Sequence, residues 1–493
     1  MKSTGAKIFA AAIHLKNKAW ISDPLKYQKK TFSNLIKKAK NTSFGKDHFF
    51  ENITNYEDFK KAVPVRDYEG LRPYVEKMLE GDSDVLWPGK PLYYAKTSGT
   101  TSGVKYIPIS KESMPAHIQA ARDALLNYIH QTGNTDFVKG KQIFLQGSPI
   151  LDKKGDSTFG RLSGIVAHYV PKYLQKSRMP SWDTNCIEDW ETKIDAVVEE
   201  TIAENMTLIA GIPSWVQMYF EKLIEKSKKP VGELFKNFSL FVYGGVNYEP
   251  YRPLFEELIG KKVDSIELFP ASEGFFAYQD QQNNKGLLLL VNHGIFYEFI
   301  EAAHFSEENP KRISLEEVKL DVNYVLIITT TAGLWAYNIG DTVKFVSLTP
   351  YRIVVTGRIK HFISAFGEHV IGKEVETAME KVCLGTSIQV KEFTVAPQIK
   401  PDNGLPYHEW FIDFVNPPED FKKFAESLDI EMQTQNVYYE DLIKGKVLKQ
   451  LVVTQVASGG FQTYMKSIGK LGGQNKIPRL SDDRKICNQL PLK

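Results

Sequence analysis

The sequence predicts an α/β protein with a large N-terminal domain of mixed α/β sheets, which includes a β subdomain, and a small, mobile α+β C-terminal domain. Between residues 142 and 269, short apolar runs alternate with helical patterns, the order expected of an open α/β sheet. Between residues 285 and 356, apolar runs follow one another without helices, which indicates an antiparallel β subdomain. We therefore predict domains at residues 1–358 and 359–493, joined by a hinge.

The composition is that of an ordinary globular protein, and 493 residues are enough for two to four domains at roughly 100 to 200 residues each. The 62 basic side chains nearly balance the 59 acidic ones, so the net charge of +3 supplies no field for binding nucleic acid. Cys186, Cys383 and Cys487 are too few and too far apart for a disulfide framework or a thiolate metal site. We therefore expect a cytoplasmic protein without a nucleic-acid partner.

The N-terminal region predicts two helices. The apolar run at residues 8–13 is too short for a signal peptide, because a histidine and lysines interrupt it. The spacing of Ile8, Ala12, Leu15 and Ala19 is helical, and it favours an amphipathic first helix. Residues 23–38 place Asp23 at a cap with a proline just inside a second helix. No run reaches transmembrane length, so we expect no membrane partner.

The remaining elements follow from apolar runs with turn residues at their ends. Buried strands of the open sheet are predicted at residues 142–145, 206–210, 239–243 and 263–269. Helices between them are predicted at residues 188–204, 214–225 and 250–258. Strands of the β subdomain are predicted at residues 287–291, 324–330, 343–346 and 352–355. Strands of the C-terminal domain are predicted at residues 389–395, 410–415 and 447–455.

The segment LYYAKTSGTTSGVKYIP, residues 92–108, is typical of a loop that holds phosphate groups. Gly99 and Gly103 permit backbone conformations closed to other residues, and Lys105 adds a positive charge. Short hydroxyl donors come from Thr97, Ser98, Thr100, Thr101 and Ser102. A helix predicted at 111–131 would place the loop between a strand and a helix, where phosphate binders usually lie. The spacing is not that of a Walker A loop, and an ordinary surface loop is the alternative interpretation.

The octapeptide FPASEGFF, residues 269–276, ends a predicted strand in small residues and one carboxylate. Ala271 and Ser272 let a flat ring approach the backbone. Glu273 is a candidate Mg²⁺ ligand, since that ion takes one or two carboxylates together with phosphate oxygens and water. A glutamate on a solvated loop is the alternative.

Two further segments supply candidate nucleotide ligands. In YNIGD, Gly340 is predicted to turn the chain, and Asp341 is placed to accept both ribose hydroxyls. An aspartate that caps its own backbone in a hairpin turn is the alternative. In TGRIKHFISAFGEHV, Arg358 is placed to bridge to ribose or phosphate, and Lys360 lies at the predicted hinge.

The ordered set TSGTTSGVK, FPASEGFF, YNIGD and TGRIKHFISAFGEHV resembles the adenylate-forming enzymes, the superfamily of firefly luciferase and the acyl-CoA ligases. TTTAGLWAYNIGD and the C-terminal GFQTYMKSIGKLGGQNKIPRL look like the auxin-responsive acyl-acid amido synthetases of plants, the Gretchen Hagen family, and their bacterial relatives. The resemblance covers nearly the whole chain. It implies that ATP and a carboxylic acid give an acyl-adenylate and pyrophosphate, and that an amino acid then attacks to give an amide. It also implies that Lys476 neutralises phosphate charge during adenylation, with a solvated tail lysine as the alternative.

The sequence departs from the plant pattern at two places. Asn338 stands where plant members usually carry arginine, and Ala271 and Ser272 stand where they carry two serines. The plant hormones are therefore not assumed as substrates. Because apolar and aromatic residues abound there, we expect a pocket for an aromatic or fatty acyl group near Gly244, Gly245, Val246, Ala332 and Tyr337.

Two other functions remain open at this stage. An acyl-CoA ligase shares the first half-reaction and the nucleotide motifs, and a catalytically idle nucleotide-binding or scaffold protein would keep them without turnover. The expected partners are ATP, Mg²⁺, a carboxylic acid and an amino acid, and the expected state is a monomer or weak dimer.

Overall fold

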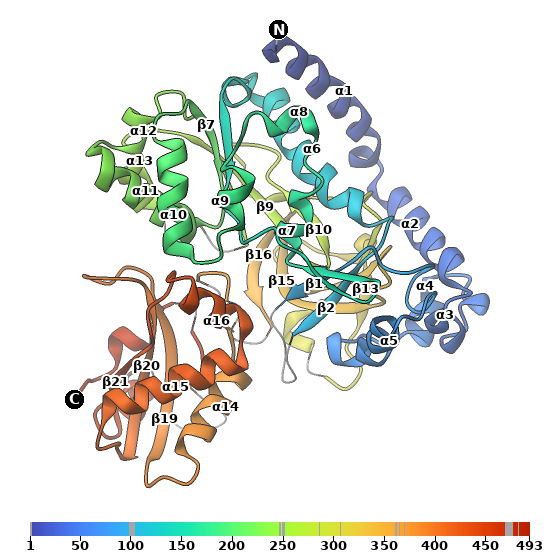
Figure 1. Cartoon of the computed structure of the whole chain (residues 1–493). Helices are drawn as coiled ribbons and strands as arrows, with labels where there is room; N and C mark the ends of the chain where they lie inside the picture. The colour runs from blue at the N-terminus through green and yellow to red at the C-terminus, as the bar shows by residue number, and fades with distance from the viewer. Residues whose placement is uncertain are drawn as a thin grey trace. The chain divides into compact units, whose positions relative to one another are not determined.

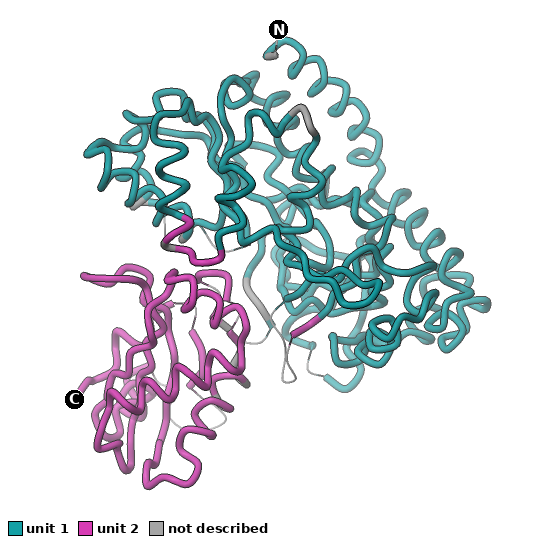
Figure 2. Tube along the Cα trace, viewed as in Figure 1, with its two compact units in different colours: residues 1–97, 106–187, 194–359 teal, residues 98–105, 188–193, 360–493 magenta. Residues whose placement is uncertain are grey.

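The computed structural model divides the chain into two compact units (Figures 1 and 2). The larger unit comprises residues 1–97, 106–187 and 194–359, and the smaller comprises residues 98–105, 188–193 and 360–493. The structure describes residues 2–97, 104–245, 248, 252–284, 286–305, 307–359, 362–363, 365–368, 370–468, 477–481 and 483–493. The mobility of the smaller unit and the hinge at Lys360 stay predictions, and Lys360 lies outside the described residues.

One sheet of twelve strands forms the centre of the larger unit, in the order β13-β12-β14-β15-β16-β11-β10-β9-β8-β7-β3-β6. Its parallel half contains β3 (Lys141–Phe144), β6 (Arg178–Met179), β7 (Met206–Ala210), β8 (Leu240–Gly244) and β9 (Asp264–Ala271). Its antiparallel half contains β10 (Gly274–Tyr278), β11 (Leu287–Leu289), β12 (Ile295–Glu301), β13 (Arg312–Ser314), β14 (Asn323–Thr330), β15 (Tyr337–Leu348) and β16 (Tyr351–Arg358). The predicted α/β fold with a β subdomain is confirmed, and its two parts share one hydrogen-bonded sheet.

The central parallel strands β7 and β8 are nearly fully buried, because helices follow them in the chain and cover the sheet. The helices of this region are α7 (Leu162–Ala167), α8 (Lys172–Gln175), α9 (Trp182–Cys186), α10 (Trp190–Thr201), α11 (Pro213–Ser227), α12 (Val231–Leu234) and α13 (Arg252–Ile259). Every residue of β7 is buried, as its uninterrupted apolar sequence predicts. The predicted helices at 188–204, 214–225 and 250–258 correspond to α10, α11 and α13 within a few residues.

A second sheet carries both ends of the glycine loop, and all its residues except Lys105 belong to the larger unit. Its order is β2-β1-β5-β4, built from β1 (Tyr93–Thr97), β2 (Lys105–Ile109), β4 (Asp152–Lys154) and β5 (Ser157–Gly160). The helix α6 (Met114–Thr132) begins only after β2. The prediction that the loop lies between a strand and a helix is therefore wrong, because the segment KYIPI forms a strand first.

The N-terminal region is helical, with α1 (Lys2–Ser22), α2 (Pro24–Ala39), α3 (Ser43–Asp47), α4 (Tyr56–Ala62) and α5 (Tyr68–Glu80). Short 3₁₀ turns along the chain are η1 (Phe50–Asn52), η2 (Asp136–Val138), η3 (Ala302–His304), η4 (Leu315–Glu317) and η5 (Cys487–Gln489). The side chain of Asp23 accepts a hydrogen bond from the Lys26 amide at 3.3 Å, so the predicted cap of α2 is confirmed.

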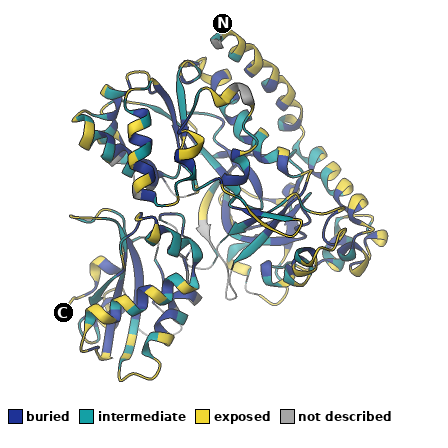
Figure 3. Cartoon of the chain, viewed as in Figure 1, coloured by how far each residue is buried: buried dark blue, intermediate teal, exposed yellow. Residues whose placement is uncertain are grey.

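Helix α1 packs against α6 through the face opposite to its predicted apolar stripe. Ala10, Ile13 and Trp20 are buried, whereas Ile8 and Leu15 are 67% and 69% exposed. Figure 3 shows that this N-terminal helix is exposed along much of its length. A buried polar contact explains the choice of face, since the Asn17 amide lies 3.4 Å from the Asp123 carboxylate and accepts from the Trp20 indole at 3.0 Å. Among the described helices, none is long and apolar enough to cross a membrane.

Helix α2 is fixed to the large sheet by Gln28, which is 3% exposed. Its amide group donates to the carbonyls of Val291 at 3.0 Å and Ile295 at 2.9 Å, and its oxygen accepts from the Tyr297 amide at 2.9 Å. One side chain therefore satisfies three backbone groups where the chain passes from β11 to β12.

The smaller unit is α+β, as predicted. Its main sheet has the order β19-β20-β21, with β19 (Gln389–Gln398) antiparallel and β21 (Val452–Gln455) parallel to β20 (Tyr407–Asn416). A two-stranded sheet pairs β17 (Phe362–Ile363) with β18 (Val370–Ile371). The helices of this unit are α14 (Gly372–Cys383), α15 (Phe421–Gln435), α16 (Val437–Lys444) and α17 (Gly460–Ser467).

Candidate active site

The ends of the glycine loop are Thr97, the last residue of β1, and Lys105, the first residue of β2. The loop residues Ser98, Gly99, Thr100, Thr101, Ser102 and Gly103 lie outside the described residues. Pairing holds the two strands together, since the Leu92 amide donates to the Ile109 carbonyl at 2.8 Å. Tyr94, which is 1% exposed, stacks on Phe159 of the parallel neighbour β5 with ring centres 5.3 Å apart.

A second group of candidate residues lies at the carboxyl ends of β8 and β9, where ligands of open α/β sheets bind. Gly244 ends β8, and a Cβ at this position would lie 2.4 Å from the Leu268 carbonyl oxygen. Only glycine therefore permits the observed approach of β8 to β9. Gly245 follows with a φ of 84°, and Val246 lies outside the described residues.

The turn between β9 and β10 presents Ser272 and Glu273. Ala271 and Gly274 are cross-strand partners, so the two residues between them form a tight hairpin turn. All of Ala271, Ser272 and Glu273 are partly exposed. A carboxylate at such a turn is accessible to a cation that phosphate oxygens also bind, as the Mg²⁺ interpretation requires.

A third group lies on β15 and β16, where Asp341 and Arg358 are cross-strand partners. The sequence predicts a turn at Gly340 and a strand only at 343–346, and this is wrong, because β15 runs without interruption from Tyr337 to Leu348. Gly340 has a φ of 85° at a point where the pairing register with β14 shifts, so it forms a bulge instead. Asp341 is 9% exposed at this bulge. The Ile359 amide donates to the Gly340 carbonyl at 2.9 Å and holds the end of β16 in place.

A buried ion pair connects the strands that carry the second and third groups. Arg352 of β16 makes two hydrogen bonds to Asp280, two residues after β10, at 2.8 and 2.6 Å. Asp280 raises the pKa of Arg352 through this contact. The pair spans β11 and fixes β16 relative to β10. Sequence reasoning missed it, although an arginine at the start of the apolar run RIVV was an available signal.

Two residues of the expected acyl pocket are buried in this structure. Ala332 is 3% and Tyr337 is 1% exposed. The backbone beside Tyr337 pairs with Arg66, whose amide donates to Ala336 at 3.1 Å and whose carbonyl accepts from Asn338 at 2.7 Å. Nδ1 of His48 donates to the Phe44 carbonyl at 2.9 Å, so Nε2 accepts from the Arg66 guanidinium at 2.7 Å. Burial lowers the pKa of this histidine.

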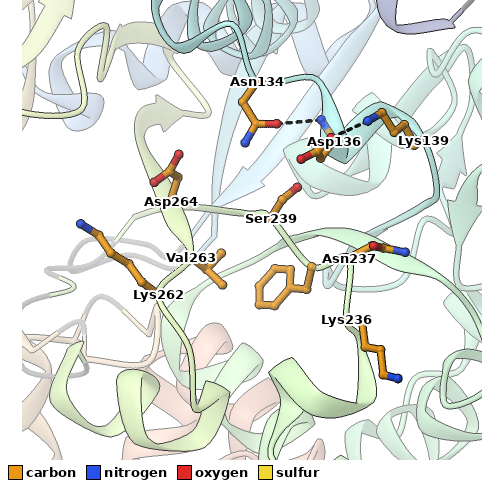
Figure 4. A pocket seen from close by; sticks show the side chains of 10 residues that line it. Asn134, Asp136, Lys139, Lys236, Asn237, Ser239, Lys262, Val263 and Asp264 are labelled. Carbon is orange, nitrogen blue, oxygen red and sulfur yellow. Dashed lines mark hydrogen bonds and ion pairs between the residues drawn. The ribbon is translucent and has the colours of Figure 1, made fainter.

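Two hollows of the larger unit lie away from these groups. One, of about 470 Å³, lies at the amino ends of β8 and β9, opposite to the ends that carry Gly244 and Ala271. Figure 4 shows the side chains that line it. Its lining residues are Asn134, Asp136, Lys139, Lys236, Asn237, Phe238, Ser239, Lys262, Val263 and Asp264. The other, of about 320 Å³, lies beside α2. Neither is lined by a predicted site residue. Among the described residues, no three His, Cys, Asp or Glu side chains are placed to hold a metal ion.

Among the candidate residues, Asp341 and Arg358 are brought side by side by backbone pairing. Lys476 and its neighbours at 469–476 lie outside the described residues, so the predicted role of this lysine stays a prediction. Arg358 is placed by its backbone in β16.

Comparison with known proteins shows similarity over most of the chain. The jasmonoyl-L-amino acid synthetase JAR4 of Nicotiana attenuata is 22% identical, with 83% of this chain and 82% of that protein covered. The indole-3-acetic acid-amido synthetase GH3.3 of Arabidopsis thaliana is 20% identical, with 92% and 88% covered.

Solved structures show the same fold. A structure of the GH3.15 acyl acid amido synthetase matches with a TM-score of 0.60 and 16% identity, over 97% of this chain and 96% of that one. The AtGH3.15 enzyme in complex with 2,4-DB matches with a TM-score of 0.62 and 15% identity, over 97% and 95%.

Three family models match successive parts of the chain. They are the GH3 family N-terminal domain at residues 17–263, the central domain at 288–358 and the C-terminal domain at 373–485. The central domain coincides with most of the antiparallel half of the large sheet. Since the three models together match most of the sequence in their natural order, the chain belongs to the GH3 family.

Proposed function

We propose that the protein is an ATP-dependent acyl-acid amido synthetase. It activates a carboxylic acid as an acyl-adenylate, releases pyrophosphate and transfers the acyl group to the amine of an amino acid. The observation that carries this proposal is the match to all three GH3 domain models in one chain. Relatives that cover most of the chain are named as synthetases that join an acid to an amino acid.

The chemistry explains the residue types of the motifs. A carboxylate is a poor nucleophile, and its attack on the α-phosphate of ATP brings two anions together. Cations and N–H donors must therefore offset the repulsion. In our proposal, Lys105, Lys476 and the hydroxyls and amides at 97–103 supply that positive potential, and no protein nucleophile is needed.

Glu273 is the proposed protein ligand of Mg²⁺. Its position suits a metal ligand, because its carboxylate is partly exposed at a hairpin turn beyond the carboxyl end of β9. When bound, the ion would neutralise phosphate charge. Ala271 and Ser272 precede Glu273 on the same turn and are the proposed contact for the adenine ring.

Asp341 is the proposed ligand of the ribose hydroxyls, with Arg358 beside it. The bulge at Gly340 supports the assignment, because a bulge re-aims the side chains that follow it. The acyl group would bind near Gly244, Gly245, Val246, Ala332 and Tyr337. Because Ala332 and Tyr337 are buried, this part of the proposal requires them to form the floor of the pocket.

The smaller unit would rotate about a hinge near Lys360, so that Lys476 serves adenylation and then leaves for amide formation. A cytoplasmic location and a monomeric or weakly dimeric state belong to the same proposal.

A two-step assay tests the function. Pyrophosphate release is measured with a panel of aromatic, fatty and small polar acids, first with ATP and Mg²⁺ alone and then with mixed amino acids or coenzyme A. Mass spectrometry then identifies the product. An amide with an amino acid is expected. A thioester with coenzyme A and no amide would replace the proposal with an acyl-CoA ligase, and no acid-dependent pyrophosphate release would reject adenylation.

Gly99→Val is the matched inactive control for this assay. A β-branched residue should block the loop backbone from approaching phosphate and abolish adenylation, while the circular dichroism spectrum stays unchanged. Normal turnover by this variant would contradict the assignment of the loop.

A further inference from the structure

The outer face of α1 combines exposed apolar residues with lysines along both borders. Ile8 is 67% and Leu15 is 69% exposed. The alanines between and beyond them on the same face, Ala11, Ala12 and Ala19, are also exposed. These five residues form the outer stripe of α1.

The helix cannot turn this stripe inward, because its other face is fixed. Ala10, Ile13 and Trp20 are buried against α6, and Asn17 makes a buried contact with Asp123. His14 stacks on His130 of α6 with ring centres 3.7 Å apart. The stripe is therefore a permanent surface of the larger unit.

Three exposed lysines border the stripe. At about 100° per residue, Lys7 and Lys18 lie roughly 80 to 100° to one side of its centre and Lys16 lies about 80° to the other side. Lysines in these positions extend their ammonium groups outward beside a face whose centre is apolar. The sequence of α1 contains no aspartate or glutamate.

The basic character continues into α2. The first 40 residues contain ten of the chain's 62 basic residues and one of its 59 acidic residues, so they carry a charge of +9 in a chain whose net charge is +3. Two of these lysines are neutralised, since Lys29 pairs with Glu316 at 3.3 Å and Lys38 pairs with Glu112 at 2.6 Å. The charge next to the stripe on α1 has no such acidic partner in its own helix.

We propose that α1 is a membrane-surface helix that lies on anionic phospholipid, with Ile8 and Leu15 inserted between headgroups and Lys7, Lys16 and Lys18 on lipid phosphates. An apolar stripe with basic borders fits that surface, where helices insert by about 5 to 10 Å. Symmetric pairing of two copies of α1 would bring like charges together. A nucleic acid would contact the lysines but leave the apolar centre of the stripe without an apolar partner. The expectation of no membrane partner rested on the lack of a spanning segment, whereas this contact is peripheral.

Vesicle sedimentation tests the proposal with the full chain and without substrates. We expect binding to phosphatidylcholine vesicles that contain about 30% phosphatidylglycerol, weak binding to pure phosphatidylcholine, and loss of binding when salt rises from about 0.1 M to about 1 M. Lys7→Gln/Lys16→Gln/Lys18→Gln should lower the partition coefficient by about 10²-fold, at roughly fivefold per lysine near the surface. Ile8→Ser/Leu15→Ser should also lower it.

Matched controls come from exposed positions of the smaller unit. Lys400→Gln/Lys422→Gln/Lys423→Gln removes the same charge, and Val415→Ser/Ile430→Ser removes apolar side chains that are 64% and 62% exposed. Both should bind vesicles like the parent. The thermal midpoints of all four variants are compared to confirm folding.

Three outcomes would overturn the proposal. They are equal binding of the α1 and control variants, no preference for anionic over zwitterionic vesicles, and absence of vesicle binding. Light scattering would detect a dimer that forms without lipid. If vesicle binding is absent and Ile8→Ser/Leu15→Ser dissociates such a dimer, the stripe is a contact between two copies of this chain.

Discussion

Replacing Arg352 with methionine tests the ion pair that fixes β16 relative to β10. The two side chains are only 9% and 10% exposed, and two charge-assisted hydrogen bonds join them. Methionine fills part of the space of the arginine stem but leaves the Asp280 carboxylate buried without its cation. Breaking a buried pair by removing one partner costs about 3 to 5 kcal/mol. We therefore expect the free energy of unfolding of the larger unit to fall by about 4 kcal/mol.

Guanidinium denaturation measures this loss, and hydrogen exchange of peptides covering residues 274–291 and 351–358 localises it. Adding Asp280→Leu removes the orphaned charge and should restore most of the stability. Lys444→Met is the control, because it breaks an exposed pair whose side chains are 66% and 34% exposed, and it should cost less than about 0.5 kcal/mol. A loss below about 1 kcal/mol for Arg352→Met, unchanged in the double variant, would refute the reasoning.

Three further predictions follow from the site and its surroundings. His117→Gln should flatten the pH dependence of stability. Burial lowers the pKa of His117 from 6.5 in the unfolded chain to about 4 in the folded protein. The stabilisation present above pH 6.5 is therefore lost as the pH falls from 6.5 to about 4, because only the unfolded chain takes up a proton in that range. Denaturation at several pH values measures it, and an unchanged slope would contradict it. Asp341→Ala should raise the KM for ATP in the pyrophosphate assay, and a structure with AMP in which Asp341 faces away from the sugar would count against that role. Lys476→Ala should slow pyrophosphate release by about 10²- to 10³-fold yet consume pre-formed acyl-adenylate almost normally. Equal losses in both steps would show that this lysine has no step-specific role.

Runs whose apolar residues are continuous were predicted well from the sequence. The strand at 206–210 matches β7 residue for residue, and 239–243 matches β8 within one residue. Burial on both faces of a parallel strand requires such a run, so the pattern and the structure have the same cause.

Elements whose shape depends on distant partners were predicted poorly. The strand β15 extends six residues further toward the N-terminus than its apolar run, because pairing with β14 outweighs the break at Gly340. The helix α1 was predicted correctly, but its apolar spacing did not reveal which face is buried. That choice depends on Asn17 and Asp123, which are 106 positions apart in the chain. The pair Arg352–Asp280, whose members are 72 positions apart, depends on a contact of the same kind.

The hydrogen bonds of Gln28 impose an order on the formation of the native structure. Their partners at 291, 295 and 297 lie 263 to 269 positions further along the chain. At about 5 to 20 residues per second, synthesis needs roughly 13 to 54 seconds to supply them after Gln28 is made. Throughout that interval the buried face of α2 has no β12 to pack against. Helix α2 therefore docks late, and during translation its apolar face needs protection from aggregation.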